Sequence, residues 1–316
     1  MAWLKLVRWQ NLVIVFLTQL FAWGCVILPM RHYSPVPLVL GWNNFMLLSL
    51  STVLIAAAGY IINDYFDVKI DIINRPEKLI LEKRIPIKLA ILVHTVLNLV
   101  AIFLAVVVAR RAGHYSFIAM QLGCTLMLWL YSTTFKRKFV SGNVIVSILT
   151  AFTIAVLMLY ENAIRYYLFE DFFIYAGDLL IPNPVWVLGT YAFFAFMLTW
   201  MREIVKDMED FKGDAEQGCV TMPIKWGLLR SARFTQLLGL LTVIPLVIGV
   251  AKLLKEQWYV LGIYTLLGLA TPILVWMYYL PKGATTKHYG KESRYLKIIM
   301  VLGVVSLIIY YFQTNG

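Results

Sequence analysis

The chain has 316 residues, of which 61% are hydrophobic and only 14% are charged. A soluble domain carries about 25% charged residues, so this composition excludes an ordinary soluble protein and indicates an integral membrane protein with many helices. The net charge of +11 has no soluble basic domain to carry it, which argues against nucleic acid as a partner, and the three cysteines are too scattered for a disulfide framework.

Nine apolar runs are long enough to cross, or nearly cross, a bilayer core of about 30 Å. The first run follows Lys5 and Arg8 and is longer than a signal peptide needs, so we expect it to be retained as a helix. The nine runs cover residues 11–30, 45–66, 87–109, 115–131, 142–160, 185–205, 234–251, 258–280 and 296–313. They predict an all-α membrane protein with about nine transmembrane helices in a single domain, residues 1–316.

The distribution of Lys and Arg predicts the orientation of the chain. If the N-terminus is cytoplasmic, 22 of the 28 Lys and Arg residues fall on the cytoplasmic side and six on the other side. Such an asymmetry is typical of the positive-inside rule. The basic cytoplasmic face is therefore expected to meet anionic membrane lipid or an anionic substrate.

The second apolar run ends in an acidic cluster. On a continuous helix, Asn63, Asp64, Asp67 and Asp71 fall within roughly a quarter turn of one another, because each residue advances by about 100°. Carboxylates this close repel unless a cation lies between them, and Mg²⁺ binds oxygen ligands of this kind together with substrate phosphates. A solvated acidic helix end is the alternative interpretation for any one of these acids.

A second acidic cluster follows the sixth run, on the same predicted side of the membrane. Asp207, Asp210 and Asp214 lie within about 60° on a helical wheel, with Glu203 between them, although Gly213 makes a helix as far as Asp214 doubtful. The two clusters occupy equivalent places in two four-helix pseudo-repeats, about 11–131 and 142–280, followed by the ninth helix. This duplication predicts two acidic faces that meet across a central cavity.

Two opposed acidic faces with interleaved cations suit a Mg²⁺-bound diphosphate. Topology charges and lipid contacts are the alternative interpretation for each single cation. Apolar helices below such a site offer a cavity for a hydrocarbon tail, and aromatic rings there can stabilise a carbocation. The pattern therefore indicates an enzyme that ionises an allylic isoprenoid diphosphate and transfers the prenyl cation to an acceptor. The candidate cations are Lys69, Arg75, Lys136, Arg137, Lys138, Arg202 and Lys206.

Three segments together resemble the UbiA superfamily of intramembrane prenyltransferases. They are Asn63-x3-Asp67-x3-Asp71 with Arg75-Pro76, Tyr131-x4-Lys136 leading into Gly142-Asn143, and the second acidic motif around Asp207. The resemblance implies the UbiA prenyltransferase fold and a cofactor, Mg²⁺. It implies that catalysis depends on Asp64, Asp67, Asp71, Asp207 and Asp210. The implied metal ligands are Asn63, Asp67, Asp71, Asp207, Asp210 and Asp214, and the implied substrate-binding residues are Asn63, Arg75, Tyr131, Lys136, Arg202 and Lys206.

Within this superfamily, the segments from Asn63 to Glu77 and from Arg202 to Pro223 are similar to digeranylgeranylglyceryl phosphate synthases. That similarity implies geranylgeranyl diphosphate as donor and the hydroxyl of geranylgeranylglyceryl phosphate as acceptor, with Asp64 or Asp71 taking the proton. It also implies a prokaryotic cell membrane with the active site open to the cytoplasm. The segment Lys78 to Arg84 departs from the proline-containing stretch that often follows in the family, which leaves the choice of acceptor open.

Two other functions are open at this stage. An aromatic acceptor of quinone or haem biosynthesis needs fewer cations than a phosphorylated lipid, and both fit the same donor site. A transporter also fits nine helices with a basic cytoplasmic side, but transporter sites typically lie near the bilayer midplane, whereas these acids lie at helix ends.

Overall fold

The computed structural model describes residues 1–74, 79–282 and 285–315, and within these ranges the chain is helical apart from its loops and one short hairpin. Nine of the described helical segments are long and apolar enough to cross a membrane, which confirms the predicted fold class. The nine segments are Trp9–His32, Trp42–Val68, Ile87–Ala112, Phe117–Phe135, Ser141–Tyr160, Pro184–Glu209, Leu228–Lys255, Tyr259–Tyr279 and Thr286–Thr314.

The chain divides into two compact units. Unit 1 contains residues 1–136 and 152–189, and unit 2 contains residues 137–151 and 190–316. The helices α6 (Ser141–Tyr160) and α8 (Pro184–Glu209) each contribute residues to both units. The predicted duplication into two four-helix repeats stays a prediction.

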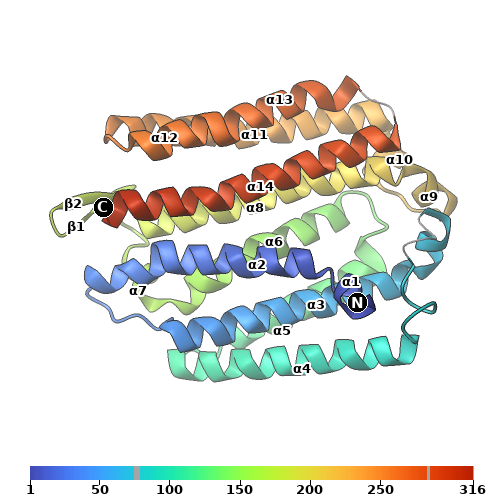
Figure 1. Ribbon diagram of the computed structural model, residues 1–316, viewed down its shortest axis with the longest axis horizontal. Coiled ribbons are helices and arrows are strands. Elements are labelled where there is room, and N and C mark those ends of the chain that lie inside the picture. The colour runs from blue at the N-terminus through green and yellow to red at the C-terminus, as the bar shows by residue number, and fades with distance from the viewer. Residues whose placement is uncertain (75–78, 283–284, 316) are drawn as a thin grey trace. The chain divides into compact units, whose positions relative to one another are not determined.

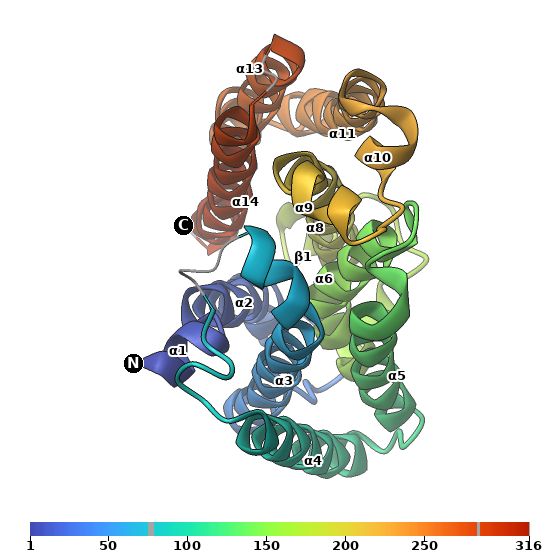
Figure 2. The ribbon, with the colours of Figure 1, turned by 90° about the vertical axis from the view of Figure 1, so that its right-hand side faces the viewer.

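Unit 1 is built around the long helix α3, which packs along α4 and α5 (Figures 1 and 2). Its core near the N-terminus contains Leu6, Ile61, Leu81 and Ile85, so the short first helix and the segment after α3 pack on the same part of that helix. The elements complete within this unit are α1 (Ala2–Leu6), α2 (Trp9–Ala22), α3 (Trp42–Asn74), α4 (Ile87–Ala112), α5 (Phe117–Leu130), α7 (Asn162–Tyr166), β1 (Phe173–Ala176) and β2 (Leu179–Pro182).

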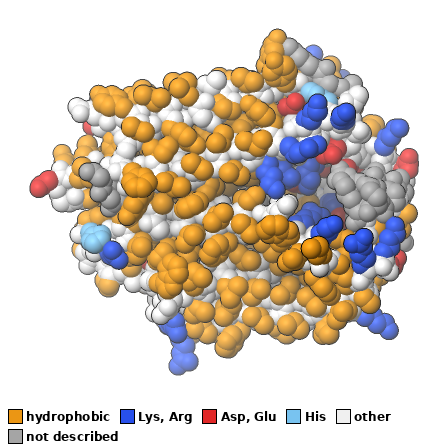
Figure 3. Space-filling model, viewed as in Figure 1, with side chains coloured by type: hydrophobic (Ala, Val, Ile, Leu, Met, Phe, Trp, Pro, Cys, Tyr) orange, Lys and Arg blue, Asp and Glu red, His pale blue; other side chains and the backbone are white. Residues whose placement is uncertain are grey.

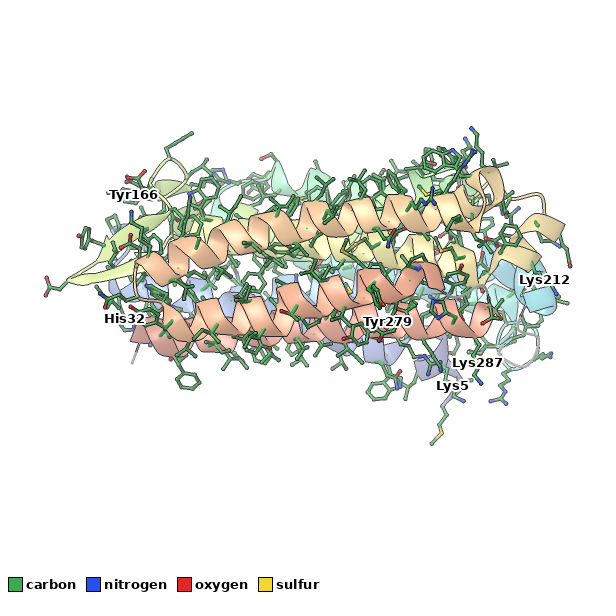
Figure 4. The ribbon with its side chains drawn as sticks, turned by 90° about the horizontal axis from the view of Figure 1, so that it is seen from above. Lys5, His32, Tyr166, Lys212, Tyr279 and Lys287 are labelled. Carbon is green, nitrogen blue, oxygen red and sulfur yellow. The ribbon has the colours of Figure 1, made fainter. Side chains whose placement is uncertain are left out.

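The hairpin of β1 and β2 lies in the loop with the acidic residues that precedes α8. Its strands are antiparallel, with Ile174 opposite Ile181. The buried carboxylate of Glu161 accepts hydrogen bonds from the backbone N–H groups of Leu40 (2.8 Å) and Ala163 (3.0 Å), so it anchors this end of the unit. Figure 4 shows His32 and Tyr166 toward this end of unit 1 and Lys5 toward its other end.

Unit 2 packs α8 against the helices that follow it. Residues of α8 at a spacing of three or four, including Met201, Ile204 and Met208, are buried with Trp276 in one hydrophobic core. Along α11, an added Cβ on Gly239 would lie 2.6 Å from the Met277 sulfur, so α11 and α13 approach closely there. The further elements are α9 (Phe211–Glu216), α10 (Met222–Trp226), α11 (Leu228–Lys255), α12 (Tyr259–Thr265), α13 (Thr271–Tyr279) and α14 (Thr286–Asn315).

The outward faces of both units are apolar. Side chains such as Leu99 and Phe103 on α4, and Leu267 between α12 and α13, are more than 60% exposed. Hydrophobic side chains cover the helices along the face drawn in Figure 3. Exposing so many apolar side chains to water is unfavourable, whereas contact with lipid is not. The helices also satisfy their own backbone hydrogen bonds, as the interior of a bilayer requires. The protein is therefore an integral multi-pass membrane protein.

Candidate active site

In unit 1, an amide and a carboxylate of α3 form one buried polar group. Asn63 and Asp67 are only 8% and 6% exposed, and they lie one helical turn apart. The Asn63 Nδ2 donates a hydrogen bond of 2.7 Å to the Asp67 Oδ2. The helix runs through the whole motif to Asn74, as the predicted wheel required. The Asn63 Oδ1 and the Asp67 carboxylate therefore lie on one face of α3.

Lys136 supplies a positive charge to this group. Its Nζ donates to the Asn63 Oδ1 at 3.2 Å and forms an ion pair with Asp67. The chain reaches Lys136 through a π-helical turn, Tyr131–Phe135, in which the Lys136 N–H donates to the Tyr131 carbonyl at 2.9 Å. Because a π turn holds one more residue than an α-helical turn, it rotates the residues that follow it about the helix axis. This turn therefore determines that Lys136 meets α3.

Asp64 has a different cation. The Arg8 Nη2 donates to the Asp64 Oδ1 at 2.7 Å, and the Arg8 guanidinium lies 5.0 Å from the centre of the Tyr60 ring. Burial alone would lower the pKa of Arg8, but the ion pair with Asp64 and the charges of Tyr60 and Asp67 together outweigh burial and raise this pKa above its ordinary value. Arg8 also has φ +51°, a left-handed conformation that costs a non-glycine residue about 1–2 kcal/mol. The ion pair offsets this cost.

In unit 2, Asp207 is bound by Asn143. The Asn143 Nδ2 donates to the Asp207 Oδ2 at 2.9 Å, and Asn143 is buried in the first turn of α6. The carboxylates of Asp214 and Glu203 are close enough to repel Asp207. Like charges held together in this way favour the binding of a cation.

The second motif does not form one continuous helical face, and the wheel drawn through Asp207, Asp210 and Asp214 is wrong. Helix α8 ends at Glu209, and Asp210 (φ −92°, ψ 7°) is the N-cap of the separate helix α9, which carries Asp214. The helix is interrupted at Asp210, whose backbone is not helical. Gly213, where the sequence suggested an interruption, is helical and buried. Asp214 nevertheless stays within electrostatic range of Asp207.

Arg202 and Lys206 both bind Glu203. The Arg202 Nη1 lies 3.0 Å from the Glu203 Oε1, and the Lys206 Nζ lies 2.8 Å from its Oε2. Glu203 is thus the counter-ion of two predicted substrate-binding cations. That Arg202 and Lys206 contact the diphosphate stays a prediction. Arg75 and the side chain of Asp71 lie outside the described part of the structure.

The residues of unit 1 fit a divalent cation. An ammonium group stands where the oxygens of Asn63 and Asp67 converge, so this position accepts positive charge. Among the described residues, no three His, Cys, Asp or Glu side chains converge into a complete metal site. Mg²⁺ commonly takes only one or two carboxylates from a protein and completes its shell with water and substrate phosphates.

Sequence reasoning assigned no role to three residues of these groups: Arg8, Asn143 and Glu203. Arg8 counted only toward membrane orientation, and its partner lies 56 positions away. Asn143 stands in the Gly-Asn pair that carried part of the resemblance, and Glu203 lies between the acids on the wheel. The sequence therefore gave a reason to consider Asn143 and Glu203 as site residues, but it gave none for Arg8.

Comparison with known proteins gives concordant matches. The model of the UbiA prenyltransferase family matches residues 20–290. The digeranylgeranylglyceryl phosphate synthase of Methanosphaera stadtmanae is 29% identical over 264 residues, 82% of this chain and 84% of the relative. A solved structure concerned with digeranylgeranylglyceryl phosphate synthase superposes with a TM-score of 0.65 at 24% identity, covering 99% of this chain and 98% of the other. A UbiA homolog from Archaeoglobus fulgidus bound to GPP and Mg²⁺ has a TM-score of 0.58 at 15% identity, covering 98% and 100%.

Proposed function

The chain belongs to the UbiA prenyltransferase family, and from this premise we propose that it transfers a geranylgeranyl group from its diphosphate to the hydroxyl of geranylgeranylglyceryl phosphate. The family makes it a prenyltransferase. The name of the relative at 29% identity supports the donor and the phosphorylated lipid acceptor. The family homolog bound to GPP and Mg²⁺ supports a prenyl diphosphate and a metal cofactor.

The observation that carries the proposal is the position of the Lys136 ammonium group. It binds both Asn63 and Asp67, at the end of an otherwise apolar membrane-spanning segment. In the proposal, these two residues and Asp71 are the Mg²⁺ ligands of unit 1, and Asp207, Asp210 and Asp214 are the Mg²⁺ ligands of unit 2. Bound there, the metal would neutralise the diphosphate and so favour departure of this leaving group. An apolar cavity would receive the prenyl tail while the charged head stays at the helix ends.

Lys136 has a second task in this proposal. When metal and diphosphate arrive, its ammonium group exchanges Asp67 for a diphosphate oxygen, because a cation binds phosphate at least as well as carboxylate. Tyr131 and Arg75 are further substrate-binding residues in the same proposal. Because the π turn holds Lys136 beside Asn63, its ammonium group would need to move only a short way to exchange partners.

In the proposed reaction, the acceptor oxygen replaces the diphosphate at the C1 carbon of the donor. The C1–O bond breaks, and its electron pair leaves with the diphosphate. The acceptor oxygen forms the new C–O bond to C1, and its proton passes to a carboxylate, Asp64 or Asp71. The Asp64 Oδ1 already accepts a hydrogen bond from Arg8 at 2.7 Å, so Asp64 would share or exchange this contact when it takes the proton.

A product assay tests the proposal. The purified full chain, supplied with Mg²⁺ and geranylgeranyl diphosphate, is offered geranylgeranylglyceryl phosphate together with a benzoate and a naphthoate acceptor. We expect an ether-linked product from the lipid acceptor. Exclusive turnover of an aromatic acceptor would assign the chain to aromatic prenyl transfer instead.

The metal assignment has its own variants. Asp67→Asn and Asp210→Asn remove one charge from each acidic motif without changing side-chain size. We expect each to reduce Mg²⁺-dependent turnover by at least about a hundredfold, because a metal ligand is lost. Thermal unfolding close to that of the wild type shows that the fold persists, and full turnover by both variants would refute the metal assignment.

A further inference from the structure

The start of α11 in unit 2 carries two arginines without counter-ions. Arg230 and Arg233 are both exposed, and neither forms a hydrogen bond or an ion pair with any described residue. They are three positions apart, so they are neighbours on the helix surface. The first turn of α11 contains no acidic residue, and its N-terminal end already has a partial positive charge. Arg230, in that turn, therefore adds a repulsion that an anion would relieve.

An exposed aromatic side chain borders these arginines. Phe234 lies one turn after Arg230, and its ring centre is 5.7 Å from that of Trp226, at the end of α10. The Trp226 side chain is 37% exposed and also contacts Phe139, and the Lys225 ammonium lies 4.7 Å from the centre of the Phe139 ring. Figure 2 shows α10 beside α11 at this end of unit 2. Tryptophan next to lysine is typical of the interface between lipid headgroups and acyl chains.

After the arginines, α11 presents an apolar stripe on the same face. Exposed leucines and isoleucines continue the face of Arg230 along the helix, at spacings of three or four residues. They are Leu237, Leu241, Ile244 and Ile248, and each is 49–56% exposed. Such a face of a membrane-spanning segment contacts acyl chains. A positive head followed by an apolar stripe therefore matches the shape of one anionic phospholipid.

The buried side of α11 lies elsewhere on the helix. Ser231, Thr235 and Leu238 are at most 3% exposed, and they fall about 80–140° from Arg230 around the axis. The arginines are therefore directed away from the hydrophobic core of unit 2. A ligand that binds them approaches from the membrane side.

A topology charge, which needs no specific partner, is the alternative interpretation of a cation at a helix end. Lys88, near the start of α4, illustrates it, because it is exposed and precedes the exposed Leu92 and Leu99 on one face. No second Lys or Arg lies within a turn of it on α4. Arg230 and Arg233 differ because they are paired, and a guanidinium offers a planar fork that matches phosphate oxygens.

We propose that Arg230 and Arg233, bordered by Lys225 and Trp226, bind the headgroup phosphate of an anionic phospholipid whose acyl chains lie along the apolar stripe of α11. The net positive charge favours an anionic over a zwitterionic headgroup. The stripe favours a lipid over a free phosphate ion, which would leave it without a contact. This site is separate from the candidate active site and does not depend on the proposed function.

Lipid binding by the purified full chain in detergent tests the proposal. Dioleoylphosphatidylglycerol is added in increasing amounts, and thermal unfolding and native mass spectrometry report its binding. We expect one saturable site in the wild type and at least about tenfold weaker affinity in the double variant Arg230→Gln/Arg233→Gln, because charge-assisted contacts are lost. Lys88→Met is the matched control and should keep the wild-type affinity. Dioleoylphosphatidylcholine, which has a phosphate but no net charge, should not distinguish the three proteins.

Two further measurements keep the test decisive. The double variant Arg230→Lys/Arg233→Lys retains the charge and should bind the anionic lipid about threefold more weakly than the wild type, because lysine offers a point charge instead of a fork. Inorganic phosphate should not displace the lipid. The inference is overturned if the glutamine or the lysine double variant binds like the wild type, if Lys88→Met loses as much affinity, or if inorganic phosphate competes. A glutamine variant with a raised KM for a substrate and unchanged lipid binding would assign the arginines to that substrate instead.

Discussion

Asp64 and Asp67 are three positions apart on α3, yet each has its own cation. Asp64 binds Arg8 from the segment between α1 and α2, and Asp67 binds Lys136 from the turn after α5. The side chains of Arg8 and Asp64 are 40% and 19% exposed, whereas those of Lys136 and Asp67 are 32% and 8% exposed. The two carboxylates therefore differ in access and in the strength of their pairing, although the sequence presents them as one motif.

A double-mutant cycle would measure the Arg8–Asp64 pair. We expect Arg8→Met and Asp64→Asn each to lower the thermal unfolding temperature, because each leaves a partly buried charge without its partner. The double variant should lose less than the sum of the two, with a coupling energy of about 0.5–3 kcal/mol. Additive effects would contradict a direct pair. Lys5→Met, which removes an exposed charge from α1, should leave the stability unchanged.

At the scale of elements, the close approach of α3 and α5 holds Lys136 near its partners. A Cβ added at Gly59 would lie 2.9 Å from the Leu128 Cδ1 and 3.0 Å from its Cδ2. Leu128 lies in α5, shortly before the π turn that leads to Lys136. Any larger residue at position 59 would therefore have to displace the Leu128 side chain on α5.

We expect Gly59→Val to destabilise the protein by about 1–3 kcal/mol through overpacking. Turnover should fall as well, because a displaced α5 carries Lys136 away from Asn63 and Asp67. Thermal unfolding and the product assay measure the two effects. Gly123→Val, on α5 itself, is the matched control, since nothing lies within 4 Å of a Cβ added there. Equal behaviour of the two variants would contradict the role of this helix contact.

At the scale of the whole molecule, the charge asymmetry of 22 to 6 leads us to propose that the N-terminus and both acidic motifs face the cytoplasm. Two exposed positions make this testable. Tyr175, in the β1–β2 hairpin, is 75% exposed and belongs to the loop assigned to the outer side. Lys212, in α9 beside the second motif, is exposed (Figure 4) and belongs to a segment that we assign to the cytoplasmic side.

Labelling of single cysteines checks the orientation. In a background without Cys25, Cys124 and Cys219, an impermeant maleimide should label Tyr175→Cys in intact cells. It should label Lys212→Cys only in inverted membrane vesicles, because Lys and Arg are retained on the cytoplasmic side. The reverse pattern would place the proposed active site on the outer side of the membrane.

The sequence by itself determined the class of the protein, the number and approximate limits of its membrane helices, and the two acidic motifs. These properties depend on hydropathy and on residue order within one helix, which are local. The helix through Asn63, Asp67 and Asp71 was predictable for that reason, since it follows from an unbroken apolar run of α3.

Only the tertiary structure decided which side chains meet. The partners of Asp64, Asp67 and Asp207 lie 56, 69 and 64 positions away in the chain. The helical periodicity of the sequence does not predict the backbone break at Asp210 or the π turn before Lys136. The physical reason is that a buried charge accepts whichever counter-charge the packing of the helices brings to it, and hydropathy does not encode that packing.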